Sequence, residues 1–102
     1  MNIFKITKMT SSDIDEVFHL EELIHPGHHW SKDSFYSEAA NNLASYFCIR
    51  SEGNILAGYT GIWKIIDEAH ITSLAVHPDF RRSGAASALM VQIIEDCYKN
   101  KI

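Results

Sequence analysis

One segment, residues 70–90, constrains the fold of this chain more than any other. An apolar run at residues 74–76 leads into a turn with the spacing Arg81-x-x-Gly84-x-Ala86, and a helical pattern follows at once. Small residues fill positions 83–88, so the backbone there can approach a ligand closely. The first N–H groups of a helix lack intrahelical acceptors and attract anions. The segment therefore predicts a phosphate site at a helix start; a glycine that only eases the turn is the alternative.

The rest of the sequence predicts a single α+β domain over residues 1–102, with a mixed, mostly antiparallel sheet. Apolar periodicity, helix caps and turn residues give the element order β-α-α-β-β-β-α. The expected strands cover residues 3–7, 45–51, 55–66 and 69–76, and the expected helices cover residues 10–24, residues 31–38 and the stretch from residue 84 onward. Gly58 and Gly61 lie inside the long third strand, which predicts a bend or a close backbone approach there.

The pattern of the last helix predicts which of its faces packs on the sheet. Leu89, Ile93 and Cys97 share one face, with Met90 and Ile94 beside them. The polar residues take the other face, namely Gln92, Glu95, Asp96 and Lys99. Cys97 and the second cysteine, Cys48, both lie in apolar patterns, which favours buried free thiols over a disulfide.

Charge and composition narrow the classes of partner. The formal net charge of −4 argues against nucleic acid as a partner, because phosphate binding usually needs a basic surface. The N-terminus does not resemble a signal peptide, and no stretch is long and apolar enough for a membrane span. A cytoplasmic protein with neither a nucleic-acid nor a membrane partner is therefore expected.

The segment 70–90 resembles motif A of the GNAT superfamily of N-acetyltransferases, commonly written Arg/Gln-x-x-Gly-x-Gly/Ala. Arg81, Gly84 and Ala86 match that pattern, with Ala at the last small position. Three upstream segments resemble the RimI-like enzymes of this superfamily, which acetylate protein N-termini: His29-Trp30-Ser31-x-x-x-Phe35, Ile55-x-x-Gly58-Tyr59 and Asp67-Glu68-Ala69-His70-Ile71. The resemblance covers nearly the whole chain and implies a three-layer α/β arrangement.

This resemblance implies acetyl-CoA as co-substrate, and a protein N-terminus or peptide amine as acceptor, with the N-terminal alanine of a ribosomal protein as the expected example. In similar proteins the turn amides hold the pyrophosphate of coenzyme A, and the preceding strand pairs with the pantetheine arm like an added strand. The cofactor-binding residues implied here are Leu74, Ala75, Val76, Arg81, Arg82, Ser83, Gly84, Ala85, Ala86 and Ser87. For the two arginines, phosphate contacts are favoured over plain surface charge.

Members of the family continue well past the motif into further strands and another helix. That part holds an Asn that contacts the cofactor and a Tyr that protonates the leaving thiolate. The sequence is therefore expected to be an acetyltransferase cut short after Ile102, and a poor or inactive enzyme by itself. The strand edge and apolar face exposed by such a truncation would favour a homodimer.

His70 is the candidate general base. It opens the strand 69–76, and alternation predicts that it shares one face with Thr72, Leu74 and Val76. By resemblance, this strand position holds a base that acts through water in some GNAT enzymes, and the ordinary histidine pKa of about 6.5 suits that role. A strand-end histidine that only forms a hydrogen bond is the alternative. Glu68 and Glu22 are weaker candidates.

Three histidines, His25, His28 and His29, surround Pro26-Gly27. Zinc sites usually show a clearer ligand pattern, so no metal is expected; by resemblance this loop borders the peptide-substrate groove. Trp30 and Trp63 have apolar neighbours, which favours packing over recognition.

Three functions stay open. The first is a RimI-like N-acetyltransferase, the second is a non-catalytic acetyl-CoA-binding fragment, and the third is a small α+β module whose turn holds another phosphate ligand. Motif A together with the upstream segments favours the first function over the third.

Overall fold

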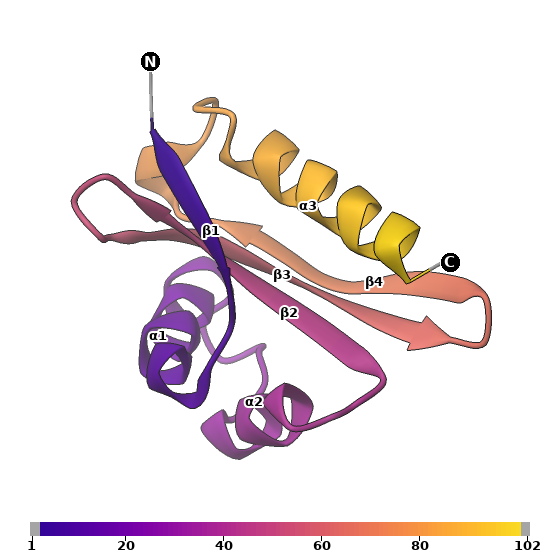
Figure 1. Ribbon diagram of the computed structural model, residues 1–102. Coiled ribbons are helices and arrows are strands. Elements are labelled where there is room, and N and C mark those ends of the chain that lie inside the picture. The colour runs from indigo at the N-terminus through magenta and orange to yellow at the C-terminus, as the bar shows by residue number, and fades with distance from the viewer. Residues whose placement is uncertain (1–2, 101–102) are drawn as a thin grey trace.

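A four-stranded sheet with the order β1-β2-β3-β4 forms the middle layer of the protein (Figure 1). In the computed structural model, which describes residues 3–100, the strands are β1 (Phe4–Lys8), β2 (Ala44–Ser51), β3 (Leu56–Ile65) and β4 (Glu68–Val76). All three strand pairings within residues 3–100 are antiparallel. The predicted α+β class and element order are confirmed.

Three α-helices cover the two faces of this sheet. The helices α1 (Ile14–Ile24) and α2 (Lys32–Ala39) lie on one face, and α3 (Ala85–Lys99) lies on the other (Figure 1). Two short 3₁₀ helices, η1 (Ser11–Asp13) and η2 (Pro78–Phe80), precede α1 and α3. The Ser31 hydroxyl accepts a hydrogen bond of 3.2 Å from the Ser34 amide and caps α2, as the sequence predicts. Within residues 3–100, none of the helices is long and apolar enough to cross a bilayer.

An apolar core fills each of the two layers between helices and sheet. The core under α1 and α2 contains Ile14, Val17, Leu20, Phe35, Tyr46, Cys48, Leu56, Tyr59 and Ala75. The core under α3 contains Phe47, Ile49, Ala57, Ala85 and Leu89. Successive side chains of β2 enter opposite cores, as strand alternation requires. Each large side chain that is fully buried contributes about 1.5–3 kcal/mol of hydrophobic free energy, so both layers stabilise the sheet.

The outer face of α3 differs from the prediction at two positions. Leu89 and Ile93 are buried as predicted, but Ile94 is 64% exposed. Asp96 was predicted to face solvent, and this is wrong: it is buried, and its carboxylate pairs with Lys64 Nζ at 3.3 Å. The helical pattern alone could not reveal this pair, because its cationic member lies on β3.

Both cysteines are free thiols, as predicted. Cys48 is fully buried in the core under α1, and this burial raises the pKa of its thiol to about 12. Cys97 is half-buried on α3. Because thiols react as thiolates, Cys48 is a packing residue and not a nucleophile.

A β-bulge interrupts β4 at Thr72. Gly61 of β3 pairs with Ser73, whereas the next β3 residue, Ile62, pairs with Ile71, so Thr72 is the extra residue. The Tyr46 ring packs closely on Gly61, because a Cβ added there would lie 2.1 Å from that ring. The prediction of a bend or close approach at this glycine is confirmed.

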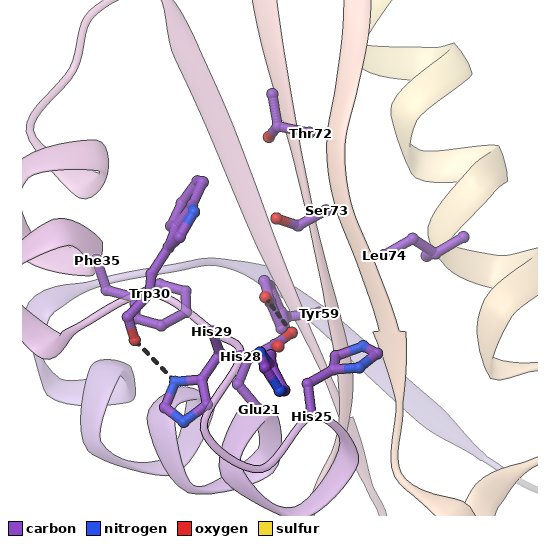
Figure 2. Close-up of a pocket in the computed structure, with 10 residues that line it drawn as sticks. All are labelled: Glu21, His25, His28, His29, Trp30, Phe35, Tyr59, Thr72, Ser73 and Leu74. Carbon is purple, nitrogen blue, oxygen red and sulfur yellow. Dashed lines mark hydrogen bonds between the residues drawn. The ribbon is translucent and has the colours of Figure 1, made fainter.

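The bulge changes which side chains of β4 share a face. Thr72 and Ser73 point toward the α1 and α2 side of the sheet, and Leu74 points toward α3 (Figure 2). Ala75 then enters the core under α1, and Val76 packs against the core under α3. The prediction that Thr72 shares a face with Leu74 and Val76 is wrong, because the extra residue shifts the alternation.

Candidate functional site

The turn between β4 and α3 leaves a row of backbone amides without acceptors. Gly84 has a φ of 90° and Arg82 has a φ of 61°, so both lie in the left-handed region. The first bond into α3 runs from the Ala88 amide to the Gly84 carbonyl at 2.9 Å. Within residues 3–100, no amide of residues 82–87 donates to a backbone or side-chain acceptor. A helix start with unpaired N–H groups is an anion site.

A hollow of about 200 Å³, here called the turn hollow, lies at these amides. Its lining residues are Val76, Phe80, Arg81, Arg82, Gly84, Ala85, Ala86 and Ser87. Arg81 and Arg82 are exposed, and neither pairs with a carboxylate in the described part of the chain. Ser83, the remaining residue of the turn, donates its hydroxyl to the Phe80 carbonyl. The structure thus brings Arg81, Arg82 and residues 84–87 together around one small concavity, whereas Ser83 lies outside its lining.

One edge of β4 runs from this turn toward a second hollow. β4 pairs with β3, and its other edge has no strand partner within residues 3–100. Val76 lines the turn hollow, and Leu74 lines a second hollow further along the strand. At ~3.3 Å per residue these two positions lie about 7 Å apart. An extended ligand can pair with such an edge, and a homodimer formed through it stays a prediction.

The second hollow, here called the histidine hollow, has a volume of about 310 Å³ and lies between β4 and the loop that joins α1 to α2 (Figure 2). Its lining residues are Glu21, His25, His28, His29, Trp30, Phe35, Tyr59, Thr72, Ser73 and Leu74. Most of them carry a polar group. The bulge contributes to this wall, because it turns both Thr72 and Ser73 toward the hollow (Figure 2).

Glu21 is a residue of this hollow that the sequence analysis missed. It is 8% exposed, and its Oε1 accepts a hydrogen bond of 2.5 Å from the Tyr59 hydroxyl. Burial and this carboxylate raise the pKa of Tyr59 well above its ordinary value, so Tyr59 stays a donor. The carboxylate predicted to border the substrate groove is the neighbouring Glu22, which is exposed. A signal was available: Glu21 follows Ile14 and Val17 at helical spacing on the buried face of α1.

His29 holds the loop between α1 and α2 in place beside the hollow. One ring nitrogen of His29 bonds to Glu22, and the other lies 2.8 Å from the Trp30 carbonyl. The Glu22 bond, followed by the carbonyl, raises the pKa of His29. The protonated imidazole of His29 therefore binds Glu22 and stabilises the loop at low pH. This interaction weakens as the pH rises through the raised pKa of His29. Within residues 3–100, no group of three or more His, Cys, Asp or Glu side chains is arranged to hold a metal ion.

Trp30 makes a packing contact, as predicted, whereas Trp63 is 37% exposed and is held by a hydrogen bond. The Trp30 ring lies 5.4 Å from the Phe35 ring, and its side chain also lines the histidine hollow. Trp63 donates from Nε1 to the Glu38 carboxylate at 2.7 Å.

His70 lies outside both hollows. Its side chain is 56% exposed, and its Nε2 lies 3.1 Å from the Glu68 carboxylate, near the start of β4. The structure therefore does not bring His70 together with the residues of the turn or with Glu21. Its role as a base stays a prediction.

Comparison with known proteins matches the chain to one family. The model of the acetyltransferase (GNAT) family matches residues 14–102. A Bacillus subtilis (strain 168) protein, named provisionally as a ribosomal protein bS18-alanine N-acetyltransferase, is 38% identical over 93 residues, which cover 90% of this chain and 60% of that protein. The ribosomal protein bS18-alanine N-acetyltransferase of Escherichia coli (strain K12) is 26% identical over 95% of this chain and 64% of its own length. The chain thus spans less than two thirds of these relatives.

Solved structures share the fold. The crystal structure of the ribosomal-protein-S18-alanine N-acetyltransferase from Escherichia coli matches with a TM-score of 0.82 and 24% identity, over 96% of this chain and 61% of that one. The PaiA N-acetyltransferase from Thermoplasma acidophilum, in complex with coenzyme A, matches with a TM-score of 0.84 and 14% identity, over 98% of this chain and 75% of that one. The three-layer arrangement of Figure 1 is therefore that of known N-acetyltransferases.

Proposed function

Because the chain belongs to the GNAT acetyltransferase family, whose members use acetyl-CoA, we propose that it carries the cofactor-binding part of an enzyme that acetylates the N-terminal amine of a protein. The relatives named for alanine N-acetylation of ribosomal protein bS18 support this acceptor. A ribosomal protein with an N-terminal alanine is the specific acceptor that we propose, in the cytoplasm.

The observation that carries the proposal is the row of amides at residues 82–87, which have no acceptor within residues 3–100, beside Arg81 and Arg82, which pair with no carboxylate in that range. In the proposed complex these amides bind the pyrophosphate of acetyl-CoA, and Arg81 and Arg82 add positive charge. The free edge of β4 at residues 74–76 pairs with the pantetheine arm. This arrangement directs the thioester along β4 toward the histidine hollow, away from the phosphate turn.

The proposed acceptor groove is the histidine hollow. It has a volume of about 310 Å³, and the bulge of β4 forms part of its wall. N-acetylation requires a neutral amine close to the thioester carbon. His70 stays the proposed base, acting through water because it lies outside the hollow.

A second candidate is binding of acetyl-CoA without turnover by residues 1–102 alone. The observation that favours it is that the chain spans 60% and 64% of the two relatives.

The test of the acceptor class uses the chain extended to the length of its relatives. One peptide begins with alanine, has a free α-amine and lacks lysine; a second has a blocked N-terminus and one lysine. Mass spectrometry after incubation with acetyl-CoA is expected to find the acetyl group on the first peptide only. Acetylation of the lysine alone, or of both peptides equally, would contradict an α-amine acceptor.

A further inference from the structure

Glu21 is a buried carboxylate without a cationic partner. It is 8% exposed, and every ion pair in residues 3–100 uses another carboxylate. A carboxylate removed from water is costly unless a positive group or several hydrogen bonds compensate it. The only side-chain donor that reaches it within the described residues is the Tyr59 hydroxyl, at 2.5 Å from Oε1. The second oxygen, Oε2, is therefore free for a ligand.

This free oxygen is accessible from the histidine hollow. No buried side-chain oxygen or nitrogen within residues 3–100 lacks a hydrogen-bond partner. Because Oε2 has no such partner, it is not fully enclosed, and Glu21 lines the histidine hollow. Figure 2 shows the carboxylate beside the Tyr59 hydroxyl and near the loop that joins α1 to α2. A ligand that enters the histidine hollow can therefore contact Oε2 of Glu21.

No lysine or arginine of residues 3–100 lines the hollow, so neither residue type neutralises this carboxylate. Three histidines line it, and the one with the raised pKa, His29, bonds to Glu22 and not to Glu21. Because Glu21 is buried, its attraction to an opposite charge is stronger than that of a carboxylate in water. Ser73 lines the same hollow and follows the bulge, immediately before the β4 residues 74–76. A cation held by Glu21 would therefore lie next to the strand proposed to carry the pantetheine arm.

We propose that Glu21 is the residue that recognises the acceptor amine: Oε2 receives the N-terminal ammonium group, and Tyr59 fixes the carboxylate from the opposite side. This inference rests on the proposed function and adds the specificity-determining residue to it. Glu21 binds and positions the amine beside β4, and it discriminates a free N-terminus from one that is already acetylated.

The test is isothermal calorimetry on the 102-residue chain with two hexapeptides of the same sequence. Both begin with alanine; one has a free α-amine and the other is N-acetylated. A charge-assisted hydrogen bond corresponds to about 10- to 100-fold in affinity, so the free peptide is expected to bind tighter by this factor. Equal affinity for the two peptides, or no binding of either, would overturn the proposal without any variant being made.

Three variants then test whether Glu21 is the residue that distinguishes the free peptide from the N-acetylated peptide. Glu21→Gln is expected to bring the two affinities together, whereas Glu95→Gln, the same chemical change on the exposed side of α3, keeps the difference. Tyr59→Phe removes the hydroxyl, retains the ring and is expected to keep part of the preference. Circular dichroism checks that each variant is folded. Full discrimination by folded Glu21→Gln would overturn the proposal.

Binding of acetyl-CoA to the same samples separates this inference from the proposed function. Unchanged acetyl-CoA binding together with no amine preference would refute the role of Glu21 alone. A chain that prefers the free amine and does not bind acetyl-CoA would instead refute the proposed function.

Discussion

Replacing Gly84 by valine is expected to abolish acetyl-CoA binding while the sheet stays formed. Gly84 has a φ of 90°, which a β-branched residue adopts only with strain. Relief of that strain requires the turn to change, and the amides of residues 82–87 would then lose their present arrangement at the turn hollow. Loss of two charge-assisted hydrogen bonds, at about 1.5–3 kcal/mol each, corresponds to roughly 10²-fold or more in Kd. No atom lies within 4 Å of a Cβ added at Gly84, so the core is not disturbed.

Gly27 offers the matched control. It has a φ of 73°, and a Cβ added there also has no atom within 4 Å. Gly27→Val therefore imposes a similar backbone strain in the α1–α2 loop, remote from the turn in sequence. Calorimetry with acetyl-CoA is expected to give parent-like affinity for this variant and none for Gly84→Val. Parent-like affinity in both variants would show that the turn is not the pyrophosphate site.

The 102-residue chain is expected to turn over far more slowly than a version extended to the length of its relatives. In the proposed complex, residues 1–102 supply the turn amides and the β4 edge that bind acetyl-CoA in the ground state. The resemblance to the family assigns protonation of the leaving thiolate to a Tyr beyond these residues. Removing a general acid costs about 10²–10⁴-fold in rate. Loss of positioning by the remaining groove wall would add to that, because orientation is worth several powers of ten.

The measurement is release of free thiol from acetyl-CoA with an alanine-starting peptide as acceptor. The extended chain should exceed the 102-residue chain by about 10² or more, while the two bind acetyl-CoA with similar affinity. Comparable turnover would show that residues 1–102 contain the whole active site, with a general acid inside them.

Much of the fold was predictable from local patterns in the sequence. Caps such as Ser31, the apolar strands, and the turn at Gly84 each specify their own local structure, and the element order follows from them. The bulge at Thr72 was not predictable in the same way. It is a shift in the register between β3 and β4 at Gly61, where the Tyr46 ring of β2 also packs, and no local pattern contains these contacts between strands.

The candidate site likewise has a part that was predictable from the sequence and a part that only the tertiary structure reveals. The phosphate turn is contiguous in sequence, so its residues could be named from the motif. The histidine hollow is assembled from α1, the loop after it, β3 and β4, and only the tertiary structure brings Glu21 to Tyr59. His70 is the reverse of Glu21. Its position at the start of β4 predicted a base, but the structure pairs it with Glu68 away from both hollows.

The central claim is that the β4–α3 turn and the β4 edge together hold acetyl-CoA. The most direct test is a titration of the ¹⁵N-labelled 102-residue chain with acetyl-CoA, followed by the shifts of backbone amide resonances. The largest changes are expected at the amides of residues 82–87 and along residues 74–76. Saturable binding with the largest changes elsewhere, or no changes at the turn, would contradict the claim.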